Sequence, residues 1–302
     1  TIQVLQAFLA ALGNEELLKY QEAILETSYK QVEEGKARYE AGQILESDYL
    51  LLEAQHATDL HNVTSTKISL DNSLVALKNL MAMDLSYPIE LVYPDDSAME
   101  SMMRMPSQQE VVNRGMQTMP DVRISYYSVL IAEQGLKVSK SGYSPTLSLS
   151  AGVGSGHTKN FNNYGTQVND KFTPQAGLSL SIPIFNASRT RTNVKQSRIA
   201  LEQAELERNQ FLSDTEKSLI SEYGSVVSSG SQYRASETRQ NAYNSSFQAY
   251  REMFSAGSIT AVELLQQQNN YISAMNDYIQ SKYTFMLQRK VLDVYMGEEI
   301  TM

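Results

Sequence analysis

Apolar residues recur at intervals of three and four along most of the chain, which is the spacing of one buried face of an α-helix. This spacing holds over residues 1–41, and Gly42 then interrupts it. A second helix is predicted to begin at Ser47, a favourable N-cap residue, and to end near Asp84. Residues 1–84 are therefore predicted to form a helical hairpin.

The segment 85–107 loses this periodicity, and it holds three of the chain's seven prolines. It is predicted to be a connector, with one short strand over residues 89–93. Helical spacing returns near Ser107, pauses at Pro120, and makes 108–143 a helical segment.

Two segments change from the helical period to the period of a strand. Residues 145–154 and 176–185 alternate strictly between apolar and polar or small side chains. Each is ten residues long, which matches the roughly 9–11 residues that a tilted transmembrane strand needs. Residues 144–186 are predicted to be a strand pair with a loop at 155–174, and its apolar face comprises Leu147, Leu149, Leu178, Leu180 and Ile182.

After the second strand the helical period resumes and continues for about 70 residues, from 187 to about 256. A helix of that length spans roughly 105 Å, whereas the mean globular helix has about 11–12 residues. A last helix is predicted over 260–296, so that residues 187–298 form a second, longer hairpin.

The two predicted hairpin turns repeat one another. An aromatic residue, Ala-Gly, an isoleucine and an acid occur around Gly42 and again around Gly257, at a constant offset of 215 residues. The same offset pairs Asp48 with Glu263. A long-period repeat of this kind predicts two structural repeats, and their equivalence predicts about 110 further residues upstream, with two more strands.

Composition removes several classes of protein. The net charge is −9 with no run of Lys or Arg, which argues against a nucleic-acid partner. There is no Cys, so disulfides, thiolate zinc sites and cysteine nucleophiles are excluded. We found no nucleophile–base pair, histidine–carboxylate metal set or phosphate loop, so neither an enzyme nor a cofactor is expected. The connector methionines are expected to fill gaps in packing rather than to bind Cu(I) (Met99, Met102, Met103 and Met105).

These features resemble the TolC family of outer-membrane efflux proteins. The most specific similarities are the Ser144-Pro-Thr-Leu-Ser-Leu strand, the Leu180-Ser-Ile-Pro-Ile-Phe exit into a long helix, and the two Ala-Gly-x-Ile turns. The resemblance implies a mainly α fold with a membrane β-barrel portion: a homotrimer with four strands per full chain, a twelve-stranded barrel, and a coiled helical tunnel. It also places the protein in the bacterial outer membrane, with its tunnel extending into the periplasm.

The resemblance further implies a passive export duct of a tripartite efflux or type I secretion system. Its partners would be a periplasmic adaptor, an inner-membrane pump of the RND, ABC or MFS type, and outer-membrane lipid. The turn residues Gly42, Ile44, Gly257 and Ile259 would dock the adaptor. The alternative for these four residues is that they only close the hairpins.

An aperture at the periplasmic end is also implied. Glu263 would supply an acidic ring, in which three carboxylates on a threefold axis repel one another and the pKa of at least one rises. The family pattern has a second acid one helical turn further on, but this chain has Gln266 at that position, so the acidic ring should be weaker. Asp48 matches an acid that locks the closed tunnel, but its partner positions are Phe254 and Ile259, and neither can pair with it. Closure is therefore predicted to rely on packing at the turns.

Three alternatives stay open on the sequence alone. Glu263 would also suit the N-terminus of a helix without any ring. The alternating segments would also fit a soluble β-sandwich hairpin. The long helices would also fit a soluble structural coiled-coil or adaptor protein, although that class does not explain the strands.

Overall fold

The computed structural model describes residues 2–93, 96–156, 163, 165–166 and 172–298. The chain divides into two compact units, Thr1–Met119 with Thr215–Met302 and Pro120–Asp214. Each unit is described in turn.

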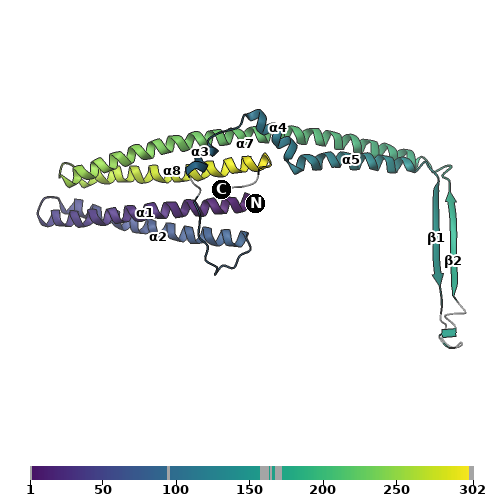
Figure 1. The fold of residues 1–302 in the computed structure, drawn as a ribbon, viewed down its shortest axis with the longest axis horizontal. Coiled ribbons are helices and arrows are strands. Elements are labelled where there is room, and N and C mark those ends of the chain that lie inside the picture. The colour runs from purple at the N-terminus through teal and green to yellow at the C-terminus, as the bar shows by residue number, and fades with distance from the viewer. Residues whose placement is uncertain (1, 94–95, 157–162, 164, 167–171, 299–302) are drawn as a thin grey trace. The chain divides into compact units, whose positions relative to one another are not determined.

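The first unit consists of two antiparallel helical hairpins whose turns lie at the same end (Figure 1). The first hairpin is formed by α1 (Ile2–Glu40) and α2 (Glu46–Leu80). The second pairs the end of α7 (Arg189–Ser255) with α8 (Ala261–Tyr295). The 67 residues of α7 make it a single continuous helix, as predicted from the apolar period.

Two apolar clusters hold the first unit together. The larger joins α1 and α8 to two short helices, α3 (Asp96–Met102) and α4 (Gln108–Thr118), through side chains such as Leu12, Val111 and Phe285. The smaller lies near the turns and comprises Leu52, Phe247, Phe254, Ala261, Leu264 and Leu265. The four connector methionines belong to or pack against the larger cluster, so they fill space in the core as predicted.

The repeat is visible in the backbone of the turns. Gly42 and Gly257 have φ values of 68° and 73°. Each turn closes with the same bonds at the same offset: Gly42 N donates to Tyr39 O at 2.9 Å, and Gly257 N donates to Phe254 O at 2.9 Å. This is the left-handed helix ending that glycine permits without strain.

The helix ends beyond the turns repeat as well. Ala82 and Gly297, again 215 residues apart, have φ values of 53° and 78°. Ala82 N donates to Asn79 O, and Gly297 N donates to Val294 O. The first repeat therefore ends with alanine in a conformation that the second repeat assigns to glycine.

The structure corrects the start and the end of the second helix. The N-cap of α2 is Leu45, which has extended backbone and no capping side chain, so Ser47 lies inside the helix. The helix ends at Leu80 rather than near Asp84, because the left-handed residue Ala82 closes it first.

The connector also differs from the prediction. The segment 89–93 forms no strand, and the connector instead contains α3. α3 lies against α8, and Met102 is buried there. The predicted N-cap at Ser107 is confirmed, since its hydroxyl accepts a hydrogen bond from Glu110 N at 3.2 Å.

The second unit contains α5 (Pro120–Ser141), β1 (Thr146–Gly154), β2 (Thr173–Ser181) and the start of α7. Ser139 and Ser197 join α5 to α7, with their hydroxyls 2.6 Å apart. The strands form an antiparallel pair in which Leu147 is opposite Leu180 and Leu149 opposite Leu178.

β2 is shifted along the chain relative to the prediction. It begins three residues earlier, at Thr173, and ends at Ser181, so Ile182 lies outside the strand. The last pair is Thr146 with Ser181, and the residue that would face Ile182 is Pro145, which has no N–H to continue the ladder. Most of the predicted loop 155–174, including His157, lies outside the described residues.

Within the described residues, no helix combines the length and the apolar character that crossing a membrane requires.

The Ala82 conformation gives a stability prediction. Replacing Ala82 with glycine removes the steric cost of a left-handed alanine, so we expect a gain of about 1 kcal/mol, read as an increase in the thermal unfolding midpoint. Gly257→Ala is the matched control with the opposite sign, because a Cβ there meets no atom within 4 Å and adds only backbone strain. Equal shifts in both variants would contradict this explanation.

Candidate functional site

A groove of about 750 Å³ lies between the turns of the two hairpins. The structure brings together six of the seven residues predicted for the turns and the aperture, which line this groove: Gly42, Ile44, Asp48, Gly257, Ile259 and Glu263. The seventh, Gln266, lies one turn further along α8 and donates to Asn270 Oδ1 at 3.2 Å. The repeat therefore marked residues that the structure brings together, and the roles expected of them stay predictions.

Glu263 is held by the N-terminus of its own helix. Its Oε2 accepts from Thr260 N at 2.9 Å, and Glu263 N donates to Thr260 Oγ1 at 3.4 Å, which is a capping box. The hydrogen bond from the Thr260 backbone lowers the pKa of the Glu263 carboxyl. In the single chain Glu263 therefore acts as a helix-terminal acid, the alternative noted from the sequence.

The first repeat lacks this capping box. Leu45 occupies the position of Thr260 and offers no side-chain acceptor. Asp48, the counterpart of Glu263, is half-buried in the groove. Phe254, one of the two residues at its expected partner positions, is 1% exposed and is contained in the smaller apolar cluster.

Arg38 connects the two turns, a contact that was not predicted from the sequence. Its Nη1 donates to Phe254 O at 2.6 Å, and its Nη2 donates to Ser255 O. Its Cζ lies 5.1 Å from the centre of the Phe254 ring, and Glu34 Oε1 is 3.1 Å from Nη2. The guanidinium thus caps the C-terminal carbonyls of α7, where the helix dipole favours a cation.

Comparison of the two repeats does not reveal the contact of Arg38 with the second turn. A basic residue in the last turn of a helix ordinarily interacts with the carbonyls of that helix, and Arg38 lies in the last turn of α1. Its counterpart in the second repeat is Met253, so the comparison of the two turns does not mark the position.

Two further polar contacts join the first hairpin to α8. Glu16 of α1 accepts from Lys282 Nζ at 2.8 and 2.9 Å and from Tyr283 Oη at 2.6 Å. Closer to the turns, Asp59 of α2 accepts from Gln268 Nε2 at 3.2 Å. Together with Arg38, these contacts extend along the seam between the hairpins, which we define as the contact surface of α1 and α2 with α8 and the end of α7.

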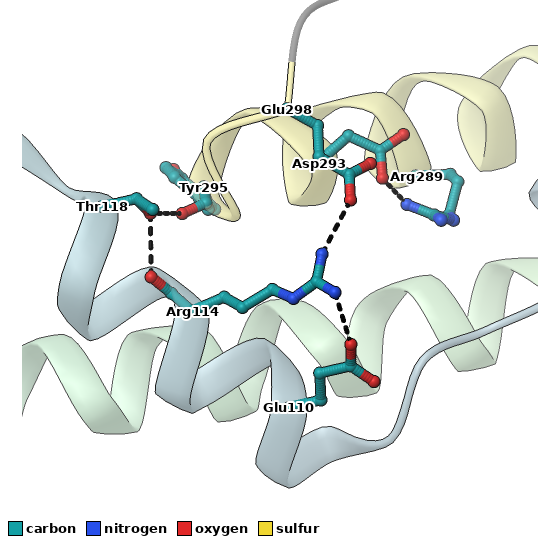
Figure 2. Close-up of polar contacts among 7 residues, drawn as sticks. All are labelled: Glu110, Arg114, Thr118, Arg289, Asp293, Tyr295 and Glu298. Atoms are coloured by element: carbon teal, nitrogen blue, oxygen red, sulfur yellow. Dashed lines mark hydrogen bonds and ion pairs between the residues drawn. The ribbon is translucent and has the colours of Figure 1, made fainter.

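The opposite end of α8 is anchored to α4, as Figure 2 shows. Arg114 bridges Glu110 at 2.8 Å and Glu298 at 3.1 Å. Thr118 Oγ1 lies 3.1 Å from Tyr295 O. Figure 2 also draws the buried residues Arg289 and Asp293, which form an ion pair within α8.

Arg38 gives a prediction about the turns. Arg38→Ala removes two hydrogen bonds from a charged donor that is 15% exposed, so we expect the contact between the turns to weaken by about 2 kcal/mol. Hydrogen exchange at the amides of Ala256, Gly257 and Ser258 should accelerate. Arg38→Lys keeps the charge but cannot donate to both carbonyls in the planar geometry, so its effect should be intermediate.

Comparison with known proteins agrees with this architecture. Residues 112–298 match the family model described as outer membrane efflux protein. The outer membrane protein TolC of Escherichia coli K12 is 24% identical over 309 residues, covering 96% of this chain and 60% of that protein. The alkaline protease secretion protein AprF of Pseudomonas aeruginosa is 23% identical over 178 residues, covering 59% of this chain and 36% of that protein.

Solved structures show the same fold. The CusC structure superposes with a TM-score of 0.77 at 15% identity, covering 97% of this chain and 67% of that one. The open state of the Neisseria gonorrhoeae MtrE outer membrane channel superposes with a TM-score of 0.76 at 15% identity, covering 98% of this chain and 65% of that one. The chain spans about 60% of the length of the TolC relative.

The matched family is that of outer membrane efflux proteins, TolC is an outer membrane protein, and the MtrE structure is that of an outer membrane channel. The family model covers more than half of the chain, including α7, both strands and the second turn. The chain therefore belongs to the outer membrane efflux protein family.

Proposed function

We propose that the chain forms part of a trimeric outer-membrane channel that serves as a passive export duct in a tripartite efflux or type I secretion system. The observation that carries this proposal is the exposed apolar face of the strand pair. Leu149 and Leu178 are opposite one another and are 79% and 69% exposed. Leu147 and Leu180 form the next such pair, both 63% exposed.

An apolar face of this kind requires a cover, and lipid supplies one. The opposite face carries Ser148, Ser150, Ser179 and Ser181, which suits a water-filled interior. Two strands leave unpaired edges, and in lipid every backbone polar group must be satisfied, so the sheet has to close with further strands. We expect strands of neighbouring subunits to close the sheet, as in a trimer with a twelve-stranded barrel.

The groove between the turns supports docking of a periplasmic adaptor. Gly42 and Gly257 expose backbone at the turns, while Ile44 and Ile259 lie beside them. Apolar side chains next to exposed backbone suit a helical hairpin of a partner protein. The adaptor would connect the duct to an inner-membrane pump. Arg38 would hold the two turns together until the adaptor docks.

The membrane assignment is tested by a pair of neighbouring substitutions. Leu149→Arg places a charge on the proposed lipid face and should cost about 2–4 kcal/mol near the bilayer midplane, with loss of folded trimer in the outer membrane. Ser148→Arg, one residue away on the opposite face, should retain the trimer and alter ion conductance in planar bilayers. Equal loss of trimer in both variants would contradict the assignment.

The aperture has its own prediction. In the trimer, three Glu263 carboxylates near the threefold axis would repel, which raises the pKa of at least one of them, the reverse of the direction in the single chain. Glu263→Gln should therefore reduce cation selectivity and block by divalent cations in bilayer recordings. Gln266→Glu should increase both, because it adds a second ring one turn along α8.

A further inference from the structure

A buried carboxylate lies in the seam between the hairpins. Asp59 of α2 is 3% exposed. Its Oδ1 accepts from Gln55 Nε2 at 2.9 Å on its own helix, and its Oδ2 accepts from Gln268 Nε2 at 3.2 Å on α8. Tyr20 and Ile24 of α1 line the same small cavity as the carboxyl. The carboxyl therefore joins α2 to α8 at a point where α1 also meets them.

No arginine or lysine pairs with this carboxyl within the described part of the chain. The titratable groups facing it are His56 on α2 and Tyr20 on α1, with Tyr271 of α8 edge-on to Tyr20 at 5.5 Å between ring centres. His56 Nδ1 lies 3.1 Å from Ser28 Oγ. Burial is the largest influence on Asp59 and raises its pKa.

A polar cavity of about 120 Å³ lies next to the carboxyl. Asp59, Tyr20, Gln21, Asn62 and Asn276 line it together with two isoleucines. Tyr20 Oη and Gln21 Oε1 are buried in the structure without a hydrogen-bond partner, and polar cavities of this size hold water. Water in this cavity would be the proton donor and acceptor next to the buried carboxyl.

The second repeat indicates that the carboxylate is not needed for packing. The residue 215 positions after Asp59 is Ala274, which is 2% exposed in the same type of helix hairpin. The counterpart of Tyr20 is Ala235, and that of Ser28 is Tyr243. The fold therefore accepts an ordinary small apolar residue at this position, and the polar group is specific to the first repeat.

We propose that Asp59 is a proton-binding site in the seam, where protonation tightens and ionisation loosens the contact of the first hairpin with α8. A neutral carboxyl still accepts through its carbonyl oxygen, and its hydroxyl can donate to Gln268 Oε1, which is buried without a partner, so it avoids the cost of a buried unpaired charge. Since its pKa is higher in the folded than in the unfolded chain, its contribution to stability is full below the ordinary value of 3.8 and is lost as the pH rises through the folded value.

The position of Asp59 connects this site to the turns. It lies eleven residues after Asp48 on α2, roughly 16 Å along the helix at 1.5 Å per residue. If the protein is the proposed export duct, whose opening requires the turns to separate, acidification favours the closed turns. This consequence rests on the proposed function, whereas the proton linkage itself does not.

The test uses the full-length trimer and two readouts. Asp59→Asn is a permanent neutral mimic, and Asp71→Asn, at an exposed position of the same helix, is the matched control. In the first readout, the protection factors of amides in α2 and α8, which are exchange rates divided into the intrinsic rate at the same pH, are compared between acid and neutral pH. The wild type and Asp71→Asn should be less protected at neutral pH, by about tenfold for each unit by which the Asp59 pKa is raised. Asp59→Asn should keep the higher protection at both pH values.

The second readout is the conductance of the trimer in planar bilayers across the same pH range. The wild type should close toward acid pH, and Asp59→Asn should lose that dependence. If Asp59→Asn fails to assemble, Asp59→Ala, which reproduces the second repeat, replaces it. The proposal is overturned if the pH dependence of protection is unchanged in Asp59→Asn or Asp59→Ala. It is also overturned if Asp71→Asn loses that pH dependence as well. Absence of conductance in every variant instead refutes the proposed channel, while the exchange result still decides the proton site.

Discussion

The packing of α8 against the first hairpin and against α7 is the interaction on which the first unit depends. A helix in a long hairpin buries only one stripe, so none of these helices can form a core alone. α8 carries thirteen buried residues along its length, and it supplies side chains to both apolar clusters. The larger cluster and the Arg114 bridges hold its C-terminal end, whereas a smaller cluster and a few polar contacts hold the end near the turns. Stability is therefore unequal along the seam.

Most of the helical architecture could be predicted from the sequence because it depends on local rules. The apolar period gave α1, α7 and α8 to within a few residues, and Ser107 began its helix as expected. The predictions failed where a distant partner decides the outcome. The connector formed α3 on α8 instead of the strand predicted at 89–93, and β2 ended early because Pro145 faces the next residue across the pair.

The candidate site shows the same division. The offset between the repeats found the groove, since both turns use the same backbone conformation. It missed Arg38, Asp59 and the pairing of Glu16 with Lys282, because each of these lacks an equivalent in the other repeat. Differences between the repeats, rather than their similarities, mark the contacts that join the hairpins.

The acceptors of Arg38 are backbone carbonyls, and this has a genetic consequence. Any residue at positions 254 and 255 that keeps α7 helical presents the same two oxygens, so substitutions there leave the hydrogen bonds intact. Selection for variants that lose these hydrogen bonds would recover changes at Arg38 and few at Ser255, whereas Phe254 is constrained by its buried ring rather than by its carbonyl. Covariation between the two sides would also be weak, and statistical contact prediction from aligned sequences would tend to overlook this link.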